Sequence, residues 1–388
     1  MQRAARLAIV ATSALLGSLA SGDAQAATAS PGLASGLDAL RTSDYARAER
    51  ELSAVHGADA PAAQIALART YLTTGRYGDA ERVAKQAGGS VSDKVMAANV
   101  RAEALFDVGK VAEAIKLLEA NKDAAGVPGR RARLLLGEYR IASGHRADAD
   151  DPLMKIIQEY NDGTIQSTDA ESLMLVGRAA HLLRSPKDAN TAFNESERIT
   201  KSDASSPVKV ETLAYRAELF LDKYDPGHAE EVLHEALTIA PHDPRLLVAM
   251  ARVKLGETLD FDAAEKLLKD ALAVNPKLPA AFAVRAGIAL RDMDLAAADA
   301  AVSAGLAIDP SDLELLTLRA ATRFLSDDRP GYEQAKREVL AKNAEFAGMY
   351  TILGDYAEWE HRYDDIVAMM KEGAQLDPDD AKVWAELG

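Results

Sequence analysis

The sequence predicts an all-α protein built as an α-solenoid, in which antiparallel helix pairs stack one after another. Three observations lead to this prediction. The 388 residues are 48% hydrophobic but only 5% aromatic, and Ala and Leu are frequent, which favours helices packed through small side chains. Runs in which apolar and polar residues alternate, as they do in strands, are hard to find. Similar phrases also return with a period of about 34 residues, which is typical of a solenoid.

The first 26 residues are interpreted as a secretory signal peptide. Arg3 and Arg6 precede an apolar stretch from Leu7 to Ala20, and Ala24-Gln25-Ala26 resembles a cleavage site. The alternative is a membrane anchor, but the stretch is shorter than the ~20 residues that span a bilayer. We therefore expect an exported protein, periplasmic or extracellular, that does not insert into the membrane once the signal is removed.

Charge and cysteine content restrict the function classes. Removing Arg3, Arg6 and Asp23 with the signal leaves 43 basic and 59 acidic residues, a net charge of about −16. Such a chain repels nucleic acid and anionic lipid, so we expect neither as a partner. The absence of cysteine from the sequence excludes an acylated lipoprotein anchor, a disulfide framework and a thiolate metal site.

Prolines mark the repeat period. Pro276 and Pro310 lie one period apart, Pro378 lies two further periods on, and the three residues end the similar phrases "LAVNP", "LAIDP" and "AQLDP". The residues from Trp384 to Gly388 likewise repeat the pattern that begins at Tyr350, one period earlier. A proline pushes the residue before it away from helical conformation, so each proline is expected to follow the end of a helix.

The chain resembles the tetratricopeptide repeat (TPR) family, specifically an exported bacterial member. The family pattern is W-x2-L-G-x2-Y, then Ala, then an aromatic residue or Leu, then Pro. Segments 63–87 and 97–121 show it clearly. The matching residues are Leu67, Ala68, Tyr71, Gly75, Ala80, Ala84 and Ala87 in the first segment, and Ala102, Leu105, Gly109, Ala114 and Leu118 in the second. The resemblance implies helix pairs that touch at small residues and that turn at Gly75, Gly109 and Gly144 in left-handed conformation.

One residue of each second helix serves as a marker for ten units between about residues 33 and 378. The markers are Ala48, Ala80, Ala114, Ala149, Ala189, Ala229, Ala264, Ala298, Tyr332 and Ile366. Most intervals between them equal the period closely, but the two on either side of Ala189 are longer, because polar runs lengthen the connections between units. Ser185, Ser206 and Asp225 each precede a proline and are predicted to cap a helix that starts at that proline.

These intervals suggest a division of the chain into five parts. Residues 1–26 are the signal peptide, and residues 27–160 form an N-terminal sub-array of about four repeats. Residues 161–210 form an irregular repeat with long connections and a possible hinge. Residues 211–378 form a C-terminal sub-array of about five repeats, and residues 379–388 begin a further one. Since complete arrays usually finish with a polar capping helix, we expect Gly388 to be the edge of a fragment.

Patterns that would indicate catalysis or metal binding are not found in the sequence. The seven histidines never form the H-E-x-x-H pattern of zinc hydrolases, and the region around Gly163 lacks the carboxylates of a calcium loop. Phosphate-binding loops and nucleophile turns are also missing. We predict no catalytic residue, no cofactor and no metal site, and therefore no enzymatic activity in this chain.

Candidate binding residues follow from aligning the first helices, which line the concave groove of such arrays. Residues one position after the small-residue slot are predicted to point into this groove, as is the residue four positions before Glu103. The candidates are Arg69, Asn99, Glu103, Glu138, Arg178, Glu218 and Asp355. A solvated face without a ligand is the alternative. The set Arg101, Arg216, Arg285 and Arg319 precedes a small residue of the first helix and is interpreted as stems that cover apolar surface, with a basic stripe as the alternative.

Two functions remain open at this stage. The favoured one is a non-enzymatic, exported scaffold that binds a protein or peptide along its groove, as the resemblance implies. The alternative is the recognition region of a larger secreted enzyme, because "GDYAEWEHRYDDIVAMMKEG" resembles repeats of exported proteins that continue into a zinc-peptidase domain. In that case the catalytic domain lies beyond residue 388.

Overall fold

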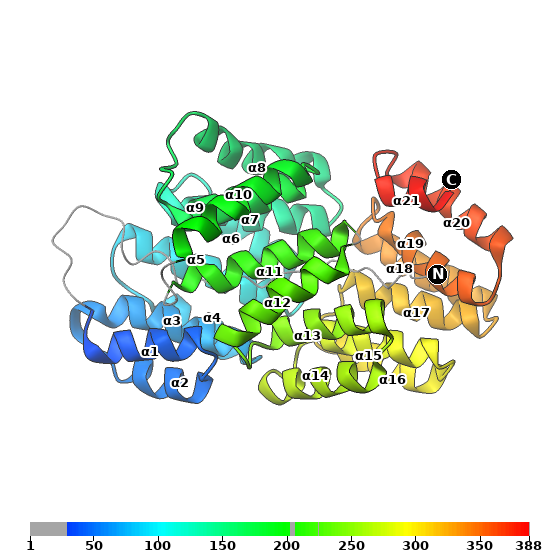
Figure 1. Ribbon diagram of the computed structural model, residues 1–388, viewed down its shortest axis with the longest axis horizontal. Helices are drawn as coiled ribbons and strands as arrows, with labels where there is room; N and C mark the ends of the chain where they lie inside the picture. Colours follow the sequence, from blue (N-terminus) through cyan, green and yellow to red (C-terminus); the bar gives the residue numbers. More distant parts are fainter. Residues whose placement is uncertain (1–28, 202–205, 224, 388) are drawn as a thin grey trace.

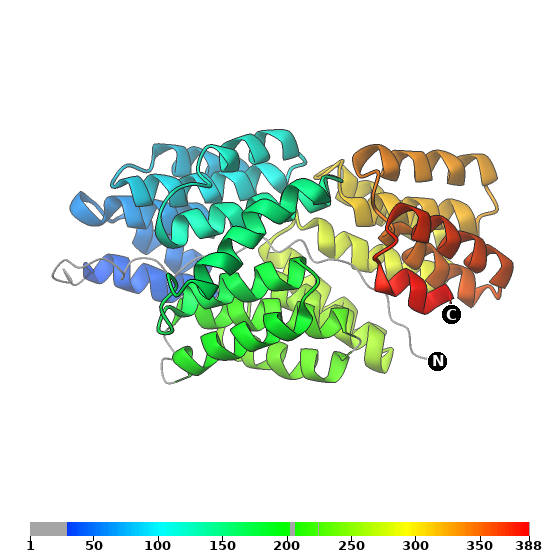
Figure 2. The same cartoon turned by 90° about the horizontal axis from the view of Figure 1, so that it is seen from above.

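The computed structural model of the chain describes residues 29–201, 206–223 and 225–387. The predicted signal peptide lies outside these ranges. Within them the structure contains 21 α-helices and no strands, which confirms the predicted fold class. Figure 1 shows that the helices follow one another from the blue end of the chain to the red end, and Figure 2 shows the same order from above.

Ten antiparallel pairs, here called units 1 to 10, make up almost the whole array. Units 1 to 5 consist of α1 (Pro31–Arg41) with α2 (Tyr45–Ser53), α3 (Ala60–Thr73) with α4 (Tyr77–Gln86), α5 (Val91–Phe106) with α6 (Val111–Glu119), α7 (Gly126–Ala142) with α8 (Arg146–Asn161), and α9 (Ala170–Leu182) with α10 (Pro186–Thr200). A short 3-10 turn, η1 (Gly57–Asp59), precedes α3.

The second half repeats this plan. Units 6 to 10 consist of α11 (Pro207–Asp222) with α12 (Pro226–Ile239), α13 (Pro244–Val253) with α14 (Phe261–Val274), α15 (Pro279–Arg291) with α16 (Leu295–Leu306), α17 (Leu313–Leu325) with α18 (Arg329–Lys342), and α19 (Gly348–Trp359) with α20 (Tyr363–Leu376). A π-helical turn, η2 (Lys254–Thr258), extends α13, and α21 (Ala381–Leu387) follows unit 10.

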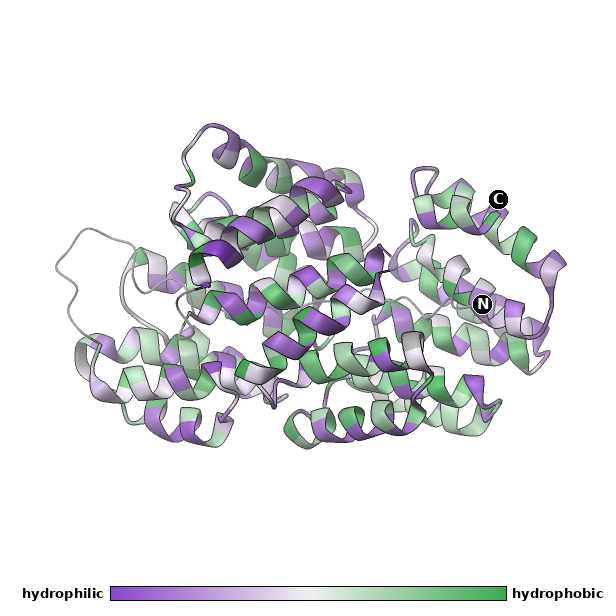
Figure 3. Ribbon diagram, viewed as in Figure 1, coloured by the Kyte–Doolittle hydropathy of each residue, from purple (hydrophilic) through white to green (hydrophobic). Residues whose placement is uncertain are grey.

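The ten marker residues all lie on second helices. The eight alanines among them have no exposed surface, Tyr332 is 5% exposed and Ile366 is partly buried. Two helices can approach closely only where the side chains between them are small, so the alanines explain the tight pairing. Figure 3 shows hydrophobic and hydrophilic residues mixed along the helices, as expected when each helix buries one face.

The predicted helix boundaries are largely confirmed. Gly75, Gly109 and Gly144 have φ angles of 73°, 75° and 77°, as the turn between two helices requires. Helices α10, α11 and α12 begin at the prolines that the sequence indicated. Of their predicted caps, the Asp225 side chain accepts a hydrogen bond from the backbone of His228, whereas those of Ser185 and Ser206 cap nothing.

Segment 161–210, where a hinge was predicted, contains the ordinary helix pair α9 and α10. These two helices pack against each other and against the units on either side. Whether the array bends there, and whether it divides into two sub-arrays, stays a prediction. Within the described ranges, no helix combines the length and the apolar character needed to cross a bilayer.

The array winds so tightly that its two halves touch. The turn inside each of units 1 to 5 meets the loop that follows the unit five places further on, and we call each such contact a rung. The hydrogen-bonded or ion-paired residues of the rungs are 193 to 202 positions apart in sequence. Each rung therefore closes one turn of the superhelix.

The first two rungs and the fourth are hydrogen-bonded. The backbone N–H of His242 donates to the Ser43 hydroxyl at 2.8 Å. The Tyr77 hydroxyl donates to the Lys277 carbonyl at 2.7 Å. The Asn343 side-chain amide donates to the carbonyls of Ile141 and Ala142 at 3.0 and 3.2 Å.

The third and fifth rungs use packing and an ion pair. Gly109 lies so close to the loop at Asp309 that an added Cβ would be 2.6 Å from a carboxylate oxygen and 3.0 Å from Pro310. In the fifth rung, the Arg184 guanidinium donates to the Asp377 carboxylate at 3.2 Å. Close contacts thus recur along the whole length of the junction.

A repeated loop conformation shapes the rungs. Asn275, Asp309, Asn343 and Asp377 follow one another at the repeat period, and in each of them a side-chain oxygen accepts a hydrogen bond from the backbone N–H two residues later. Such a turn folds the loop back on itself and presents its edge to the neighbouring half of the chain. The same period that stacks the helices therefore also places the loops that close the superhelix.

Replacing Gly109 by Ala should show how much a rung contributes to stability. An alanine in left-handed conformation costs about 1–2 kcal/mol anywhere. At Gly109 it must also displace the loop at Asp309 and Pro310, whereas Gly163 has a similar φ of 73° and open space around it. We expect Gly109→Ala to destabilise the protein by about 1–2 kcal/mol more than Gly163→Ala in urea unfolding. Equal losses would show that the third rung does not stabilise the protein.

Candidate functional site

The first helices of the units form the inner layer of the array. Successive first helices pack directly against one another, from α3 through α5, α7 and α9 to α11. In α7, all thirteen residues from Val127 to Tyr139 are buried. A helix that is buried on every side is surrounded by other elements, so this inner layer is not an open groove in units 3 to 5.

Eight charged side chains meet in this layer, and we call them the inner charged cluster. They are Arg69 of α3, Glu103 of α5, Arg131 and Glu138 of α7, Glu171 and Arg178 of α9, and Glu211 and Glu218 of α11. Three arginines thus face five glutamates. The cluster extends across five consecutive first helices.

Ion pairs within the cluster join neighbouring units. Arg131 lies 3.0 Å from Glu171 and 2.6 Å from Glu211, so one guanidinium ties α7 to two later first helices. Arg178 lies 2.6 Å from Glu138 on one side and 2.6 Å from Glu218 on the other. Arg69 and Glu103 are further apart, at 3.7 Å.

Five of the seven predicted binding residues belong to this cluster, but the prediction that they line a solvated groove needs correction. Arg69 is 1% exposed and Glu103 is fully buried. Glu138 and Arg178 are also buried, and the Glu218 side chain is 11% exposed. The reason is that successive first helices pack directly against one another, and Arg178 lies between Glu138 and Glu218, so these side chains face protein and not water. Whether they bind a partner stays a prediction.

The other two predicted residues lie outside the cluster. Asn99 is buried, and its amide donates to the Pro128 carbonyl at 2.9 Å, which ties α5 to α7. Asp355 is partly exposed on α19, where it attracts Arg291 of α15. The structure therefore does not bring all seven residues together.

Three members of the cluster were missed from the sequence. Arg131, Glu171 and Glu211 lie seven residues before Glu138, Arg178 and Glu218, on the same three helices. Seven residues are two helical turns, so both sets share a face. The sequence could have revealed these three residues through this spacing. A second indication is the 40-residue interval that separates partners on neighbouring units, such as Arg131 and Glu171.

Burial shifts the pKa values of the cluster towards the neutral forms. It raises the pKa of Glu103, Glu171 and Glu218 to about 7 and lowers the pKa of Arg69 to about 10. Burial opposes the charge of Arg178 too, but the carboxylates of Glu218 and Glu138 outweigh it and raise its pKa. Attraction to two carboxylates therefore keeps an arginine such as Arg178 charged. For the three glutamates, burial outweighs the attraction and favours the neutral form.

Glu103 is the least satisfied member. Both of its carboxylate oxygens are buried and accept no hydrogen bond from any residue that the structure describes. Its nearest cation in the cluster is Arg69, at the long distance of 3.7 Å. Burying a charge with so little compensation costs free energy, so the cluster strains the closed array as well as joining its units.

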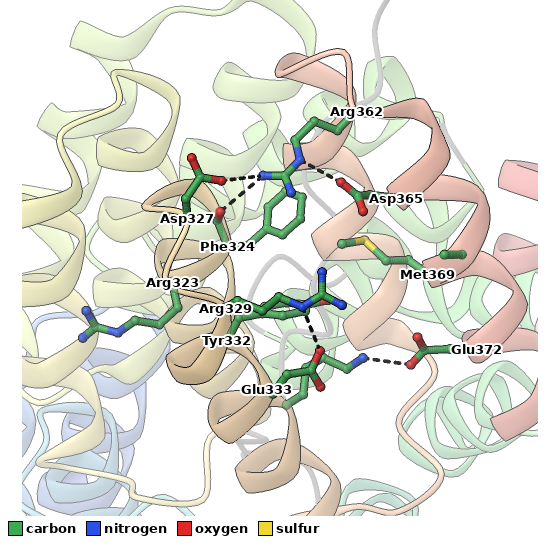
Figure 4. Close-up of a pocket in the computed structure, with 12 residues that line it drawn as sticks. Arg323, Phe324, Asp327, Arg329, Tyr332, Glu333, Arg362, Asp365, Met369 and Glu372 are labelled. Carbon is green, nitrogen blue, oxygen red and sulfur yellow. Dashed lines mark hydrogen bonds and ion pairs between the residues drawn. The ribbon is translucent and has the colours of Figure 1, made fainter.

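Two surface clefts lie elsewhere, between second helices. One, of about 240 Å³, is lined by residues of α17, α18 and α20 and contains Phe324, Tyr332 and Met369 beside charged groups. Figure 4 shows Arg362 between Asp327 and Asp365, with which it forms ion pairs. Glu372 pairs with Lys336 at 2.8 Å. The other cleft, of about 610 Å³, lies between α16 and α18. Neither cleft contains a predicted binding residue.

The four arginines that precede a small residue also find partners on second helices. Arg101 pairs with Glu81, Arg216 with Glu197, Arg285 with Glu265 and Arg319 with Glu338. In three of these pairs the glutamate belongs to the preceding unit. These ion pairs therefore join neighbouring helices at the surface.

Removing Arg178 should test whether the inner charged cluster holds the units together. Arg178→Met leaves Glu138 and Glu218 buried without a cation, and breaking such a buried arrangement costs about 3–5 kcal/mol. Arg285→Met removes an arginine of a surface pair, whose loss costs about 1 kcal/mol or less. Urea unfolding of both variants measures the difference. If the two losses agree within error, the cluster does not contribute as an ion network.

Comparisons by sequence find no match. No profile of a known protein family matches the chain, and no curated protein matches it. Within the described residues, no group of three or more acidic or histidine side chains is placed to hold a metal ion.

Solved structures are nevertheless similar in shape. The crystal structure of Rap protein complexed with competence and sporulation factor has a TM-score of 0.55 and 13% identity, covering 85% of this chain and 100% of that one. A tetratricopeptide repeat protein from Parabacteroides merdae has a TM-score of 0.45 and 13% identity over 66% and 97% of the two chains. Yeast Tom70 has a TM-score of 0.45 and 14% identity over 91% and 92%.

At these identities the resemblance concerns the fold. It agrees with the paired helices, the 34-residue period and the buried alanines described above. The chain is a tetratricopeptide-like α-solenoid.

Proposed function

We propose that the chain is a non-enzymatic scaffold, exported from the cell that makes it, which binds a protein or peptide segment carrying lysine or arginine. The observation that carries this proposal is the composition of the inner charged cluster, where five glutamates face three arginines. A basic side chain from a partner would supply the positive charge that the cluster lacks. The fold supports the proposal, because solenoids use their inner layer to hold extended segments.

The similar structure with a bound factor offers a further reason. The Rap protein, which this chain resembles in fold, was crystallised with competence and sporulation factor. A solenoid of this shape can therefore hold a partner. The alternative function, a recognition region of a secreted zinc peptidase, requires a catalytic domain outside the chain and stays a prediction.

Binding is tested with a synthetic peptide of alternating lysine and serine, and with a glutamate–serine peptide as the control for charge. We expect the basic peptide to bind and the acidic one not to bind in a fluorescence anisotropy titration. Glu218→Gln, at the most exposed end of the cluster, should weaken binding about tenfold, since one charge-assisted hydrogen bond is lost. Glu235→Gln, on the exposed face of α12, is the matched control. Equal affinity for both peptides would refute the proposal.

Export is tested by the amino terminus of the secreted protein. If residues 1–26 are a signal peptide, mass spectrometry of the protein recovered outside the cytoplasm should find Ala27 as the first residue. An intact Met1 on protein from that fraction would contradict the assignment. Retention of all the protein inside the cytoplasm would contradict export itself.

A further inference from the structure

We propose that the cleft lined by α17, α18 and α20 binds a small organic carboxylate with an apolar body, similar in size to benzoate. The cleft shares no residue with the inner charged cluster, so this binding does not depend on the function proposed above. Three features point to it: a local break in the repeat pattern, buried hydrogen-bond donors, and a volume that fits such a ligand.

The repeat pattern breaks at two buried positions of α18. The residue four positions after each marker lies one turn further along the second helix. In the other nine units this residue is apolar and buried: Leu52, Ala84, Leu118, Leu153, Phe193, Leu233, Leu268, Val302 and Met370. In unit 9 it is Lys336, which is buried as well, and the marker of this unit is Tyr332, where eight units have Ala. Buried departures from an otherwise consistent pattern are typical of functional sites.

A gap between units 9 and 10 accompanies this break. Among the described helices, the second helix of each other unit packs closely against the helix that follows it, whereas α18 does not pack closely against α19. The cleft of about 240 Å³ opens beside this junction, between α18 and α20. It therefore lies where the regular stacking of the array is interrupted.

The buried polar side chains of the cleft can donate hydrogen bonds. Lys336 is 8% exposed, and its ammonium lies 5.3 and 5.1 Å from the ring centres of Tyr332 and Tyr350. It donates to Glu372 at 2.8 Å, and an ammonium has two further N–H groups. Tyr332 is 5% exposed, and its hydroxyl makes no hydrogen bond within the described ranges. These groups favour a ligand that supplies acceptor oxygens.

The carboxylates of the cleft lie at its rim. Their side chains are 37% to 86% exposed, and each pairs with a cation; they belong to Asp327, Glu333, Asp365 and Glu372. Arg362 donates through Nε and Nη1, which leaves its Nη2 without a partner among the described residues. Because water screens the exposed carboxylates, they oppose an anion less than the buried donors attract it.

Arg329 supplies a further donor at the cleft. Its side chain is 78% exposed, and its contact with Glu333 on the same helix is long, at 3.5 Å. It donates no hydrogen bond to any residue that the structure describes. Figure 4 shows the side chain extending from α18 towards α20, between Arg362 and Glu372. A guanidinium with unused N–H groups can bind a carboxylate through two parallel hydrogen bonds.

The remaining lining suits an apolar body. Phe324 and Met369 are buried at 6% and 4% exposed, and the small side chain of Ala368 leaves space beside them. A cavity of about 150 Å³ is large enough for benzene. The cleft of about 240 Å³ therefore has room for a benzene ring that carries a carboxylate.

The charge preference is tested by isothermal titration calorimetry with benzoate. Benzamide and benzylamine, which have the same ring and are neutral and cationic at neutral pH, are the controls. We expect benzoate to bind at least about tenfold more tightly than either, since hydrogen bonds to a charged acceptor are the stronger ones. No binding of benzoate at about 10 mM, or equal affinity for benzylamine, would overturn the proposal.

The donors are tested by substitution. Arg329→Gln should weaken benzoate binding about tenfold, because a charged donor is lost. Arg337→Gln is the matched control, since Arg337 is an exposed arginine of the same helix outside the cleft, and it should leave the affinity unchanged. Tyr332→Phe removes only the hydroxyl and should weaken binding about fivefold.

The location is tested by filling the cleft. Ala368 is exposed, so Ala368→Trp should fold like the natural protein, with the same circular dichroism spectrum and thermal unfolding. We expect this variant to lose benzoate binding, because the indole occupies the space for the ring. Benzoate binding that survives both Ala368→Trp and Arg329→Gln would place the ligand elsewhere and overturn the proposal.

Discussion

The contact between a left-handed turn and a loop half the array further along the chain determines the form of this solenoid. Without it, ten helix pairs would stack as an open spiral, since each pair needs only its neighbours to bury its apolar face. The first rung brings unit 1 against the loop after unit 6. The other four bring units 2 to 5 against the loops after units 7 to 10. The charged side chains of the first helices are buried within the first half itself, where α3, α5, α7, α9 and α11 pack directly against one another.

Burial changes what the charged residues do. In an open groove, Glu103 and Arg69 would be hydrated and available to a ligand. In the closed array they lie 3.7 Å apart, and both have pKa values shifted towards neutrality. The buried charge of Arg178 is better compensated, because the carboxylates of Glu138 and Glu218 lie on either side of it. The cluster thus combines strong pairs, which align neighbouring units, with a carboxylate that gains from hydration. Both effects arise from the direct packing of successive first helices, which buries the charges and brings them within reach of one another.

The sequence predicted the local structure well and the closure not at all. The helix pairs, the buried alanines and the turn glycines follow from the repeat period, because each depends on residues within one unit or its neighbour. The loop residues Asn275, Asp309 and Asn343 share that period, yet nothing in their spacing identifies Gly75, Gly109 or Gly144 as their partners. Such pairing depends on the pitch of the superhelix, which sums small rotations over five units. The burial of Glu103 and Arg178 depends on how closely successive first helices pack, so it was equally hidden, whereas Arg131 and Glu171 were visible as residues two helical turns from predicted ones.

The residue in left-handed conformation differs between the three central rungs and the turns that lie outside the rungs. In the three central rungs the left-handed residue is glycine, and an added Cβ there would come within 2.1 to 2.8 Å of the opposing Asx side chain. The corresponding turns of units 7 to 10 have the same conformation but carry Leu259, Met293, Asp327 and His361, which also follow one another at the repeat period. A side chain in this conformation costs about 1–2 kcal/mol, which is tolerable where the residue has room but adds to a clash where a loop is packed against it. Close packing of the opposing loop therefore explains glycine at the three central rungs. In the first and fifth rungs the left-handed residues are Ser43 and Arg184, whose side chains themselves bond the opposing loop. Glycine is thus required where the backbone of the turn meets the loop directly, and a side chain is tolerated where it makes the contact itself.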